Sequence, residues 1–491
     1  MSFPLLFNSY IFILLFLPLC LVGYFGLNHF RQYKLALVFL LGMSLWFYGY
    51  FTPSYLLIIL TSVIANYSFT QLMERTHNPK LRKLEIILAV GFNLGVLFYF
   101  KYYDFFIENL NRVFQTEFTL KHILLPLGIS FFTFQQISYV VDFYRGEVEH
   151  NGFLQYACFV TYFPQLVAGP IVTHDELIPQ LMDENRKTFN WENFCKGMFL
   201  FTMGLAKKVL IADVFGGAVN WGFANVLDLD TTNAFLAALG YSIQIYFDFS
   251  GYGDLAIGIG LMMNIDLPVN FDSPYKALTI LEFWKRWHKT LTRFFTKYLY
   301  YPLGGSRKGR ARTYLNTMII YTASGLWHGA AYTYIIWGML HGAFNVIARH
   351  FKSWFDKLHP VVNWFIFFGF MVMSSSLFRS NSVTDFLNLC ENLMLMNFGP
   401  VNENIMNAFL IPEIQFLIRN VPALDILKWH PEMLLTLFYG GAMFLILGVR
   451  NAYEHMQTFR PTVWNMLGIG TLLVVCVLSF SGVSTFLYFN F

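Results

Sequence analysis

The residue best suited to catalysis in this sequence is a histidine between two apolar runs. His328 lies in Ser324–Ala330 (SGLWHGA), between the runs 313–327 and 330–348, so we expect it near the tip of a helical hairpin. A helix that starts at Thr313 would place His328 roughly 22 Å from its start, at least midway through a bilayer core about 30 Å thick. Histidine accepts or donates a proton near neutral pH, and ionisable groups at membrane depth are functional candidates. We therefore expect His328 to act as a general base towards a hydroxyl that attacks a thioester, or to carry the acyl group transiently. The alternative is a structural histidine hydrogen-bonded between helices.

A second histidine follows a cationic and aromatic segment. His288 lies in Phe283–Lys289 (FWKRWHK), which also contains Trp284 and Arg286, and cations recur every fourth position from Lys285 to Lys297. This pattern predicts one basic helix in the membrane interface. The helix could anchor the chain by its positive charge, or it could attract the phosphates of an acyl carrier such as coenzyme A. Charge spacing leaves both readings open.

Further polar groups could support such a site. Asp248 and Ser250 lie in Tyr246–Asp254 (YFDFSGYGD), where a carboxylate in an apolar region needs a partner. Asp248 could orient a histidine, pair with an arginine, or belong to a structural network. Trp327 would supply a large wall beside His328. His341 follows 13 positions after His328 and could line the same cavity.

The composition excludes a soluble fold. Of 491 residues, 56% are hydrophobic and only 13% are charged, about half the charge of a soluble domain. We expect the first run to stay as a membrane helix, because no basic residue precedes it and no cleavage site follows it. A net charge of +4 is too small and dispersed for nucleic-acid binding, and five scattered cysteines predict no metal site.

The candidate spans are 10–27, 35–51, 54–72, 84–100, 122–141, 154–172, 195–219, 233–263, 313–327, 330–348, 361–378, 433–449 and 463–484. Between 154 and 263 these runs are interrupted by proline, glycine and Lys207–Lys208, which indicates broken helices around a cavity.

The distribution of basic residues predicts an orientation. Loops that stay in the cytoplasm tend to keep Lys and Arg, and the loop 304–312 carries four such residues. The segment 379–432 instead holds six acidic and three basic residues. We expect the N-terminus and 379–432 to lie outside and 304–312 inside. The acidic segment could dock an extracytoplasmic partner or a polymer, or it could be an inert loop.

Taken in order, these segments resemble the membrane-bound O-acyltransferase (MBOAT) family. Within it they are most similar to the membrane subunits of bacterial alginate O-acetylation. The resemblance covers 120–380 strongly and both ends in hydropathy and length. The matching pieces are Gly128–Gln135, Tyr162–Ile171, Tyr246–Asp254, Phe283–His288, Tyr301–Gly305, Leu326–Gly329 and Leu377–Arg379.

The resemblance implies a fold and an activity. The fold would be all-α, a single polytopic domain over 1–491 with a catalytic core at 120–380. It would have roughly 11–13 membrane helices, plus re-entrant and short interfacial helices, around a funnel or tunnel. His328 matches the family's central histidine and His288 its second, more cytoplasmic one. Asp248, Ser250, Trp284, Arg286, Trp327 and His341 would bind the donor or support the site.

The resemblance also implies partners. The protein would lie in the bacterial inner membrane among lipids and would hold no tightly bound cofactor. It would move an acetyl group from acetyl-CoA or another acyl thioester to a secreted polysaccharide through a separate extracytoplasmic acetyltransferase. Alginate, another exopolysaccharide, peptidoglycan and teichoic acid remain open as acceptors. The rival functions are a transporter or flippase for a polar lipid or glycan, and a non-catalytic scaffold of an export complex.

Overall fold

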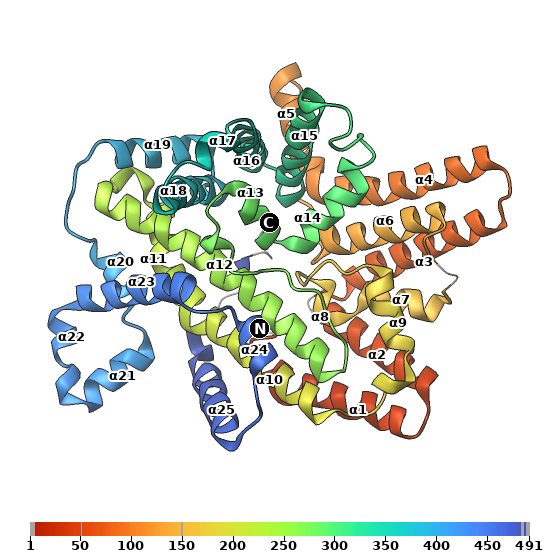
Figure 1. Ribbon diagram of the computed structural model, residues 1–491, viewed down its shortest axis with the longest axis horizontal. Coiled ribbons are helices and arrows are strands. Elements are labelled where there is room, and N and C mark those ends of the chain that lie inside the picture. Colours follow the sequence, from red (N-terminus) through yellow and green to blue (C-terminus); the bar gives the residue numbers. More distant parts are fainter. Residues whose placement is uncertain (1–4, 51, 149–150, 483–485, 488–491) are drawn as a thin grey trace. The chain divides into compact units, whose positions relative to one another are not determined.

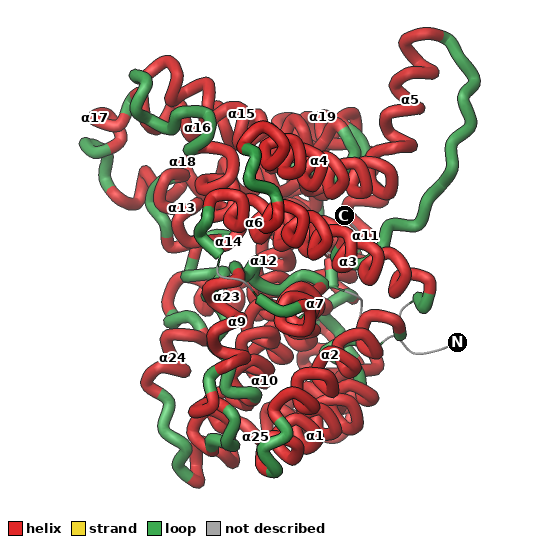
Figure 2. Tube along the Cα trace, turned by 90° about the vertical axis from the view of Figure 1, so that its right-hand side faces the viewer, coloured by secondary structure: helices red, strands yellow, loops and turns green. Residues whose placement is uncertain are grey.

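The chain is built from helices. The computed structural model describes residues 5–50, 52–148, 151–482 and 486–487, and these residues form helices and loops with no strand (Figure 2). By contacts the chain divides into two compact units: residues 1–201 with 255–269, and residues 202–254 with 270–491. The all-α expectation is confirmed. The finer division into a core at 120–380 and a segment at 379–432 stays a prediction.

The first unit contains the helices before residue 190. They are η1 (Phe12–Phe16), α1 (Leu17–His29), α2 (Tyr33–Gly49), α3 (Ser54–Arg75), α4 (Pro79–Leu97), η2 (Phe98–Tyr102), α5 (Tyr103–Phe114), α6 (Ile129–Arg145), α7 (Phe153–Thr161), α8 (Phe163–Leu166), α9 (His174–Met182) and η3 (Glu184–Arg186). Two unit boundaries fall inside α10 (Trp191–Ala206) and α12 (Thr231–Met262), and the third lies after α12, between residues 269 and 270.

The second unit holds the remaining elements. They are η4 (Lys207–Ala212), α11 (Asp213–Ala224), η5 (Val226–Asp228), η6 (Pro274–Lys276), α13 (Ile280–Arg286), α14 (Lys289–Phe295), η7 (Thr296–Tyr300), α15 (Arg310–His328), α16 (Tyr332–His350), α17 (Lys352–Phe355), α18 (Pro360–Arg379), α19 (Val383–Met394), α20 (Glu403–Asn407), α21 (Pro412–Asn420), η8 (Pro422–Leu424), α22 (Ile426–Trp429), α23 (Pro431–Gly448), α24 (Ala452–Thr458), α25 (Val463–Leu478) and η9 (Ser479–Gly482).

Several helices have the length and hydropathy of membrane spans. Among the described residues, five stretches of at least 18 residues qualify: 12–29, 54–75, 79–114, 360–379 and 431–448. Helices α2 and α25 are apolar but shorter. Other long helices, such as α12 and α15, carry polar side chains along their length. The protein is therefore a multi-pass membrane protein whose more polar helices need protein partners around them.

Polar side chains join the helices of the first unit. Helices α3, α4 and α6 lie side by side (Figure 1). Between them, the Asn66 amide donates to the Gln136 side-chain oxygen at 2.9 Å, and Gln136 donates to the Ser62 hydroxyl at 2.8 Å. The Asn93 amide donates to Asn66 at 2.6 Å. Because lipid offers no competing hydrogen bonds, such interhelical bonds specify which helices pair.

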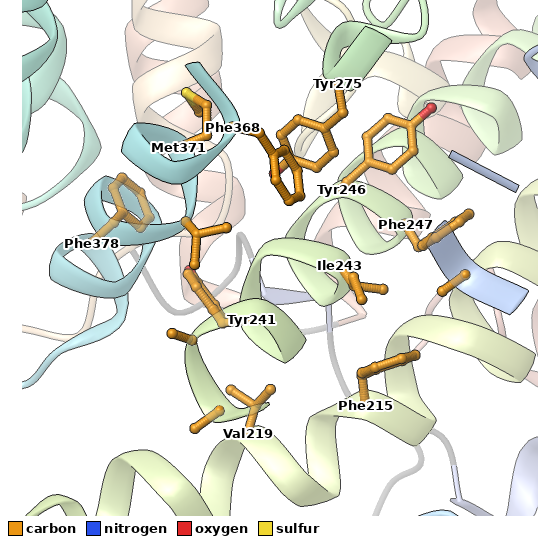
Figure 3. Packing of buried hydrophobic residues seen from close by; sticks show 14 of the residues in the cluster. Phe215, Val219, Tyr241, Ile243, Tyr246, Phe247, Tyr275, Phe368, Met371 and Phe378 are labelled. Atoms are coloured by element: carbon orange, nitrogen blue, oxygen red, sulfur yellow. The ribbon is translucent and has the colours of Figure 1, made fainter. Parts of the chain in front are cut away.

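Aromatic packing fills the second unit. Tyr275 contacts Tyr246 of α12 and Phe368 of α18, with ring centroids 5.3 and 5.4 Å apart, and Figure 3 shows these rings next to one another. Met371 and Phe378 of α18 continue the same layer. This core joins α12, η6 and α18 into one support for the residues described below.

Two local expectations differ from the structure. The predicted basic helix from Lys285 to Lys297 is two short helices, α13 and α14, because His288 takes a left-handed conformation (φ 45°) between them. The broken runs expected between 154 and 263 are confirmed only in part. The chain forms a π-helical turn at η4, but α12 is one continuous helix of 32 residues despite its five glycines.

Candidate active site

A tight helical hairpin carries His328. Helix α15 ends at His328, the backbone is extended at Gly329, and α16 begins at Tyr332. The two helices lie side by side (Figure 1) because Gly325 and Gly338 face each other; a Cβ on Gly325 would stand 3.1 Å from the Gly338 backbone. The hairpin tip predicted from the sequence is confirmed.

The imidazole of His328 borders a narrow inner cavity. The ring is 6% exposed and meets Trp337 and Phe378 edge to face, each at a centroid distance of 5.3 Å. The inner cavity has a free volume of about 40 Å³, room for a few water molecules. Its lining is mostly aromatic, with polar groups from Asp248, Ser375, Tyr275 and His328. The full lining is Ile245, Asp248, Phe249, Tyr275, Phe283, Trp287, His328, Trp337, Met371, Ser375, Phe378 and Leu487.

His288 is held rigidly beside this cavity. It is fully buried, and its Nδ1 lies 3.1 Å from the side-chain oxygen of Asn270. That oxygen also accepts from the backbone N–H and the hydroxyl of Thr290, at 3.3 and 3.0 Å. Because the Asn270 oxygen can only accept, His288 Nδ1 must donate, and in the neutral ring this leaves Nε2 unprotonated. Nε2 has no hydrogen-bond partner among the described residues.

Trp327 connects the two histidines. Its ring lies 4.9 Å from the His328 ring and 6.2 Å from the His288 ring. His288 also meets the edge of Phe249, which lines the inner cavity, at 4.9 Å. The structure thus brings His328, His288 and Trp327 together, although only His328 of the three lines the inner cavity.

Asp248 belongs to a buried ion-pair network. Its Oδ1 accepts from Lys208 Nζ at 2.7 Å, and Lys208 also pairs with Asp213 at 2.8 Å. Its Oδ2 accepts from the backbone N–H of Leu487 at 3.0 Å. The ion-pair partner of Asp248 is therefore Lys208, rather than the histidine or arginine considered from the sequence, and the role of Asp248 in the site stays a prediction. Removing one member of such a buried pair typically costs about 3–5 kcal/mol because the other charge stays uncompensated.

Two of the expected site residues lie away from the inner cavity. Arg286 donates from Nη2 and Nε to Glu282 at 2.8 and 3.1 Å and contacts the Asp272 carbonyl oxygen. Ser250 is buried in α12, and its hydroxyl has no hydrogen-bond partner among the described residues. Neither side chain lines the inner cavity.

The other two expected site residues, His341 and Trp284, form a layer behind Trp337. The centroid of the His341 ring lies 4.4 Å from that of Trp337, with the two rings tilted, and its Nε2 lies 3.1 Å from the Ser374 hydroxyl. Trp284 contacts His341 at 5.3 Å and Trp337 at 6.0 Å. Since Trp337 lines the inner cavity, His341 and Trp284 support its wall from behind.

The comparisons with known proteins identify the family. The model of the family described as "MBOAT, membrane-bound O-acyltransferase family" matches residues 45–384. A peptidoglycan O-acetyltransferase of Helicobacter pylori is 37% identical over 100% of this chain and 98% of its own length. The chain belongs to the MBOAT family. A probable alginate O-acetylase of Pseudomonas aeruginosa is 38% identical over 77% of the chain and 73% of its own length. A teichoic acid D-alanyltransferase of Bacillus subtilis is 27% identical over 52% of the chain and 69% of its own length.

Membership of the MBOAT family makes this protein an acyltransferase, as the sequence motifs indicated. The matched region includes His288, His328, Asp248 and Trp337 but ends before α20. Among the described residues, no group of three or more His, Cys, Asp or Glu side chains could hold a metal ion.

Several residues of this MBOAT site were missed by the sequence motifs. Asn270 and Trp337 hold the two histidines in place, yet neither is ionisable, so neither gave a signal. Lys208 did give a signal in the sequence, because it is a cation in an apolar run, but its ion-pair partners are known only from the structure. Leu487 comes from the far end of the chain and lines the inner cavity through a contact that no local pattern encodes.

Proposed function

We propose that this protein transfers an acetyl group from a thioester donor to a hydroxyl of a cell-envelope polysaccharide, with His328 as the catalytic residue. The observation that carries the proposal is the position of His328. His328 ends helix α15 at the tip of the helical hairpin, and its ring borders an aromatic cavity. The residue lies within the part of the chain that matches the acyltransferase family.

The proposed reaction balances with one proton moved. A hydroxyl oxygen attacks the thioester carbonyl carbon while His328 takes the hydroxyl proton; the new C–O bond forms, the C–S bond breaks, and the thiolate leaves with the proton from the imidazole. A histidine base of this kind is worth about 10²- to 10⁴-fold in rate. In the alternative route, a His328 nitrogen attacks the thioester carbonyl carbon and the C–S bond breaks, which releases the thiolate. The hydroxyl then attacks the acetyl-imidazole, the C–N bond breaks, and the hydroxyl proton passes to the thiolate.

His288 acts in this scheme as a positioning residue. Its bond to Asn270 fixes one tautomer, and its ring packs against Trp327, which in turn packs against His328. Asp248 accepts a hydrogen bond from the backbone N–H of Leu487 and so positions Leu487 in the lining of the inner cavity. We keep the donor as acetyl-CoA or another acyl thioester.

Among the acceptors, the proposal favours peptidoglycan. The peptidoglycan O-acetyltransferase of Helicobacter pylori is similar along the whole chain, including the region after residue 384, whereas the probable alginate O-acetylase covers 77% of the chain. The alginate specificity expected from the motifs therefore becomes the second candidate, and teichoic acid the third. We place the protein in the bacterial inner membrane, with 379–432 outside to meet an acetyltransferase partner and the polymer.

The proposal is tested with the purified protein in detergent and radiolabelled acetyl-CoA. The wild type should release coenzyme A and pass the label to a glycan fragment or to water. His328→Ala should lose at least about 100-fold of this rate with unchanged membrane insertion. The matched control is His77→Ala, which removes an exposed histidine. A fully active His328→Ala protein would refute the assignment.

The same assay separates the rival functions. A transporter or flippase would move an unmodified lipid or glycan and leave acetyl-CoA intact. A scaffold would leave acetyl-CoA intact and move nothing. To choose the acceptor, the acetyl content of sacculi and of secreted alginate is compared between cells with the wild type and cells with His328→Ala. Loss from sacculi alone supports peptidoglycan.

A further inference from the structure

Two further cavities lie near Trp284, which lines one of them. An outer cavity of about 410 Å³ is lined by Trp284, Tyr321, Asn345 and Arg349 among others. A neighbouring basic pocket of about 610 Å³ shares Leu281, Ser306 and Arg349 with it. Both are far larger than the inner cavity, so a sizeable polar molecule fits there but not beside His328.

The basic pocket is lined by cations. Arg310, Arg349, His350 and Lys352 border it, and the side chains of its lining residues include no carboxylate. Neither Arg310 nor Arg349 has a carboxylate within ion-pair distance in the part of the chain that the structure describes; Lys352 has a solvent-exposed pair with Asp356 at 2.8 Å, which is easily exchanged. Guanidinium groups without a carboxylate are suited to bidentate phosphate binding.

The start of α15 adds to this preference for anions. Gly309, Arg310 and Thr313, from the N-cap and first turn of this 19-residue helix, line the pocket. The first N–H groups of a helix have no intrahelical acceptor, and the helix dipole is positive at that end. Side chains and backbone thus favour the same ligand chemistry, a phosphate.

A chain of hydrogen bonds leads from this pocket to the wall of the inner cavity. Arg349 Nε donates to the Asn345 side-chain oxygen at 3.0 Å, and the Asn345 amide donates to the Tyr321 hydroxyl at 2.9 Å. The Tyr321 ring lies 5.1 Å from Trp284, and Trp284 lies 6.0 Å from Trp337. Trp284 lines the outer cavity and Trp337 the inner one, so the contact between these two indole rings joins the linings of the two cavities.

We propose that the basic pocket binds the phosphates of the thioester donor, and that Arg349, through Asn345, positions Tyr321 and Trp284 so that the acyl end passes the wall towards His328. The proposal rests on the proposed function and extends it by naming a recognition site and a positioning chain. Arg349 has two roles: its outer nitrogens bind phosphate, and its Nε holds Asn345. Arg310 has only the first role, which makes it the matched control.

The first experiment tests phosphate binding with two donors. Acetyl-CoA carries phosphates, and S-acetylpantetheine is a thioester without them. Arg310→Gln and Arg349→Gln should each raise the KM for acetyl-CoA by about 10- to 100-fold, the worth of a charge-assisted hydrogen bond. Neither should change the KM for S-acetylpantetheine by more than about twofold. Equal changes for both donors, or none for acetyl-CoA, overturn the phosphate site.

The second experiment tests the positioning chain through kcat. Tyr321→Phe should lower the kcat for acetyl-CoA with little change in KM. Arg349→Lys keeps a cation but loses the Nε donor, so it should lower kcat in the same way. In a double-mutant cycle, Arg349→Lys and Tyr321→Phe should be non-additive, whereas Arg310→Gln and Tyr321→Phe should be additive. Additivity in the first cycle overturns the chain.

These outcomes are distinct from failure of the proposed function. If the wild type consumes neither donor, the acyltransfer proposal fails and the KM comparison has no meaning. If the wild type consumes acetyl-CoA and His328→Ala does not, the proposed function holds. The pocket assignment then succeeds or fails only on the Arg310 and Arg349 variants.

Discussion

His328 and His288 have different surroundings, and we therefore expect different roles for them. His328 borders the inner cavity, which has a free volume of about 40 Å³. His288 is fully buried, has a left-handed backbone and is bound to Asn270. A buried, hydrogen-bonded ring can orient its neighbours but cannot meet a substrate without a rearrangement.

The pH dependence of stability should report the burial of His288. His288 lies between α13 and α14, outside the stretches that qualify as membrane spans, and burial lowers its pKa from 6.5 to about 3. Between these values the unfolded chain binds a proton that the folded protein does not. Stability must therefore fall as the pH falls from about 6.5 towards 3, by about 1.4 kcal/mol per pH unit from this residue.

His288→Asn isolates this contribution. Asparagine keeps an N–H near the Nδ1 position, tolerates a left-handed backbone and does not titrate. The apparent melting temperature in detergent is compared at pH 7, 6 and 5. We expect the variant to lose less stability on acidification than the wild type. Parallel pH profiles would contradict the buried, neutral state of this ring.

At the scale of elements, the α15–α16 hairpin determines where His328 stands. The helices approach closely because Gly325 and Gly338 lack side chains at the contact. A Cβ on Gly325 would overlap the Tyr334 carbonyl oxygen, a backbone atom that cannot move without displacing α16. The position of His328 relative to Trp337 of α16 thus depends on two glycines.

Gly325→Ala should weaken both the hairpin and catalysis. Overpacking of this kind costs about 1–3 kcal/mol, and the displaced hairpin should shift His328 away from the inner cavity. The matched control is Gly369→Ala in α18, where a Cβ would meet nothing within 4 Å and the gain in helix propensity is about 0.5–1 kcal/mol. Thermal unfolding and acetyl-CoA turnover are measured for both. Equal effects of the two substitutions would rule out the close contact as their cause.

For the whole molecule, the charges of two segments predict an orientation in the membrane. The loop 304–312 and the basic pocket are rich in Lys and Arg, while 379–432 is acidic. Positive charges keep loops in the cytoplasm, so the donor pocket should open on the cytoplasmic side and the acidic segment outside. This asymmetry fits a donor and an acceptor that arrive from different compartments.

Single cysteines test this orientation. The five native cysteines are first replaced by alanine, and Lys308→Cys or Asn404→Cys is then introduced at an exposed position. A membrane-impermeant maleimide should label Asn404→Cys in spheroplasts and Lys308→Cys only after permeabilisation. Labelling of Lys308→Cys in intact spheroplasts would reverse the predicted topology and remove the pocket from cytoplasmic donors.

The sequence by itself determined the membrane class, the all-helical fold, the family and the hairpin around His328. These features follow from composition, hydropathy and short motifs, all of which are local along the chain. It also drew attention to Asp248, whose charge in an apolar run demanded a partner.

Only the tertiary structure decided how these groups meet. In the structure, Asp248 pairs with Lys208, and the expected basic helix is interrupted at His288. The basic pocket takes its basic side chains from α15, α16 and α17. The tertiary structure also brought Leu487 to the inner cavity. Each of these is a contact between residues distant in the chain, or a backbone bend stabilised by such contacts. Local periodicity carries no information about them, because packing between helices decides which of several locally acceptable partners is chosen.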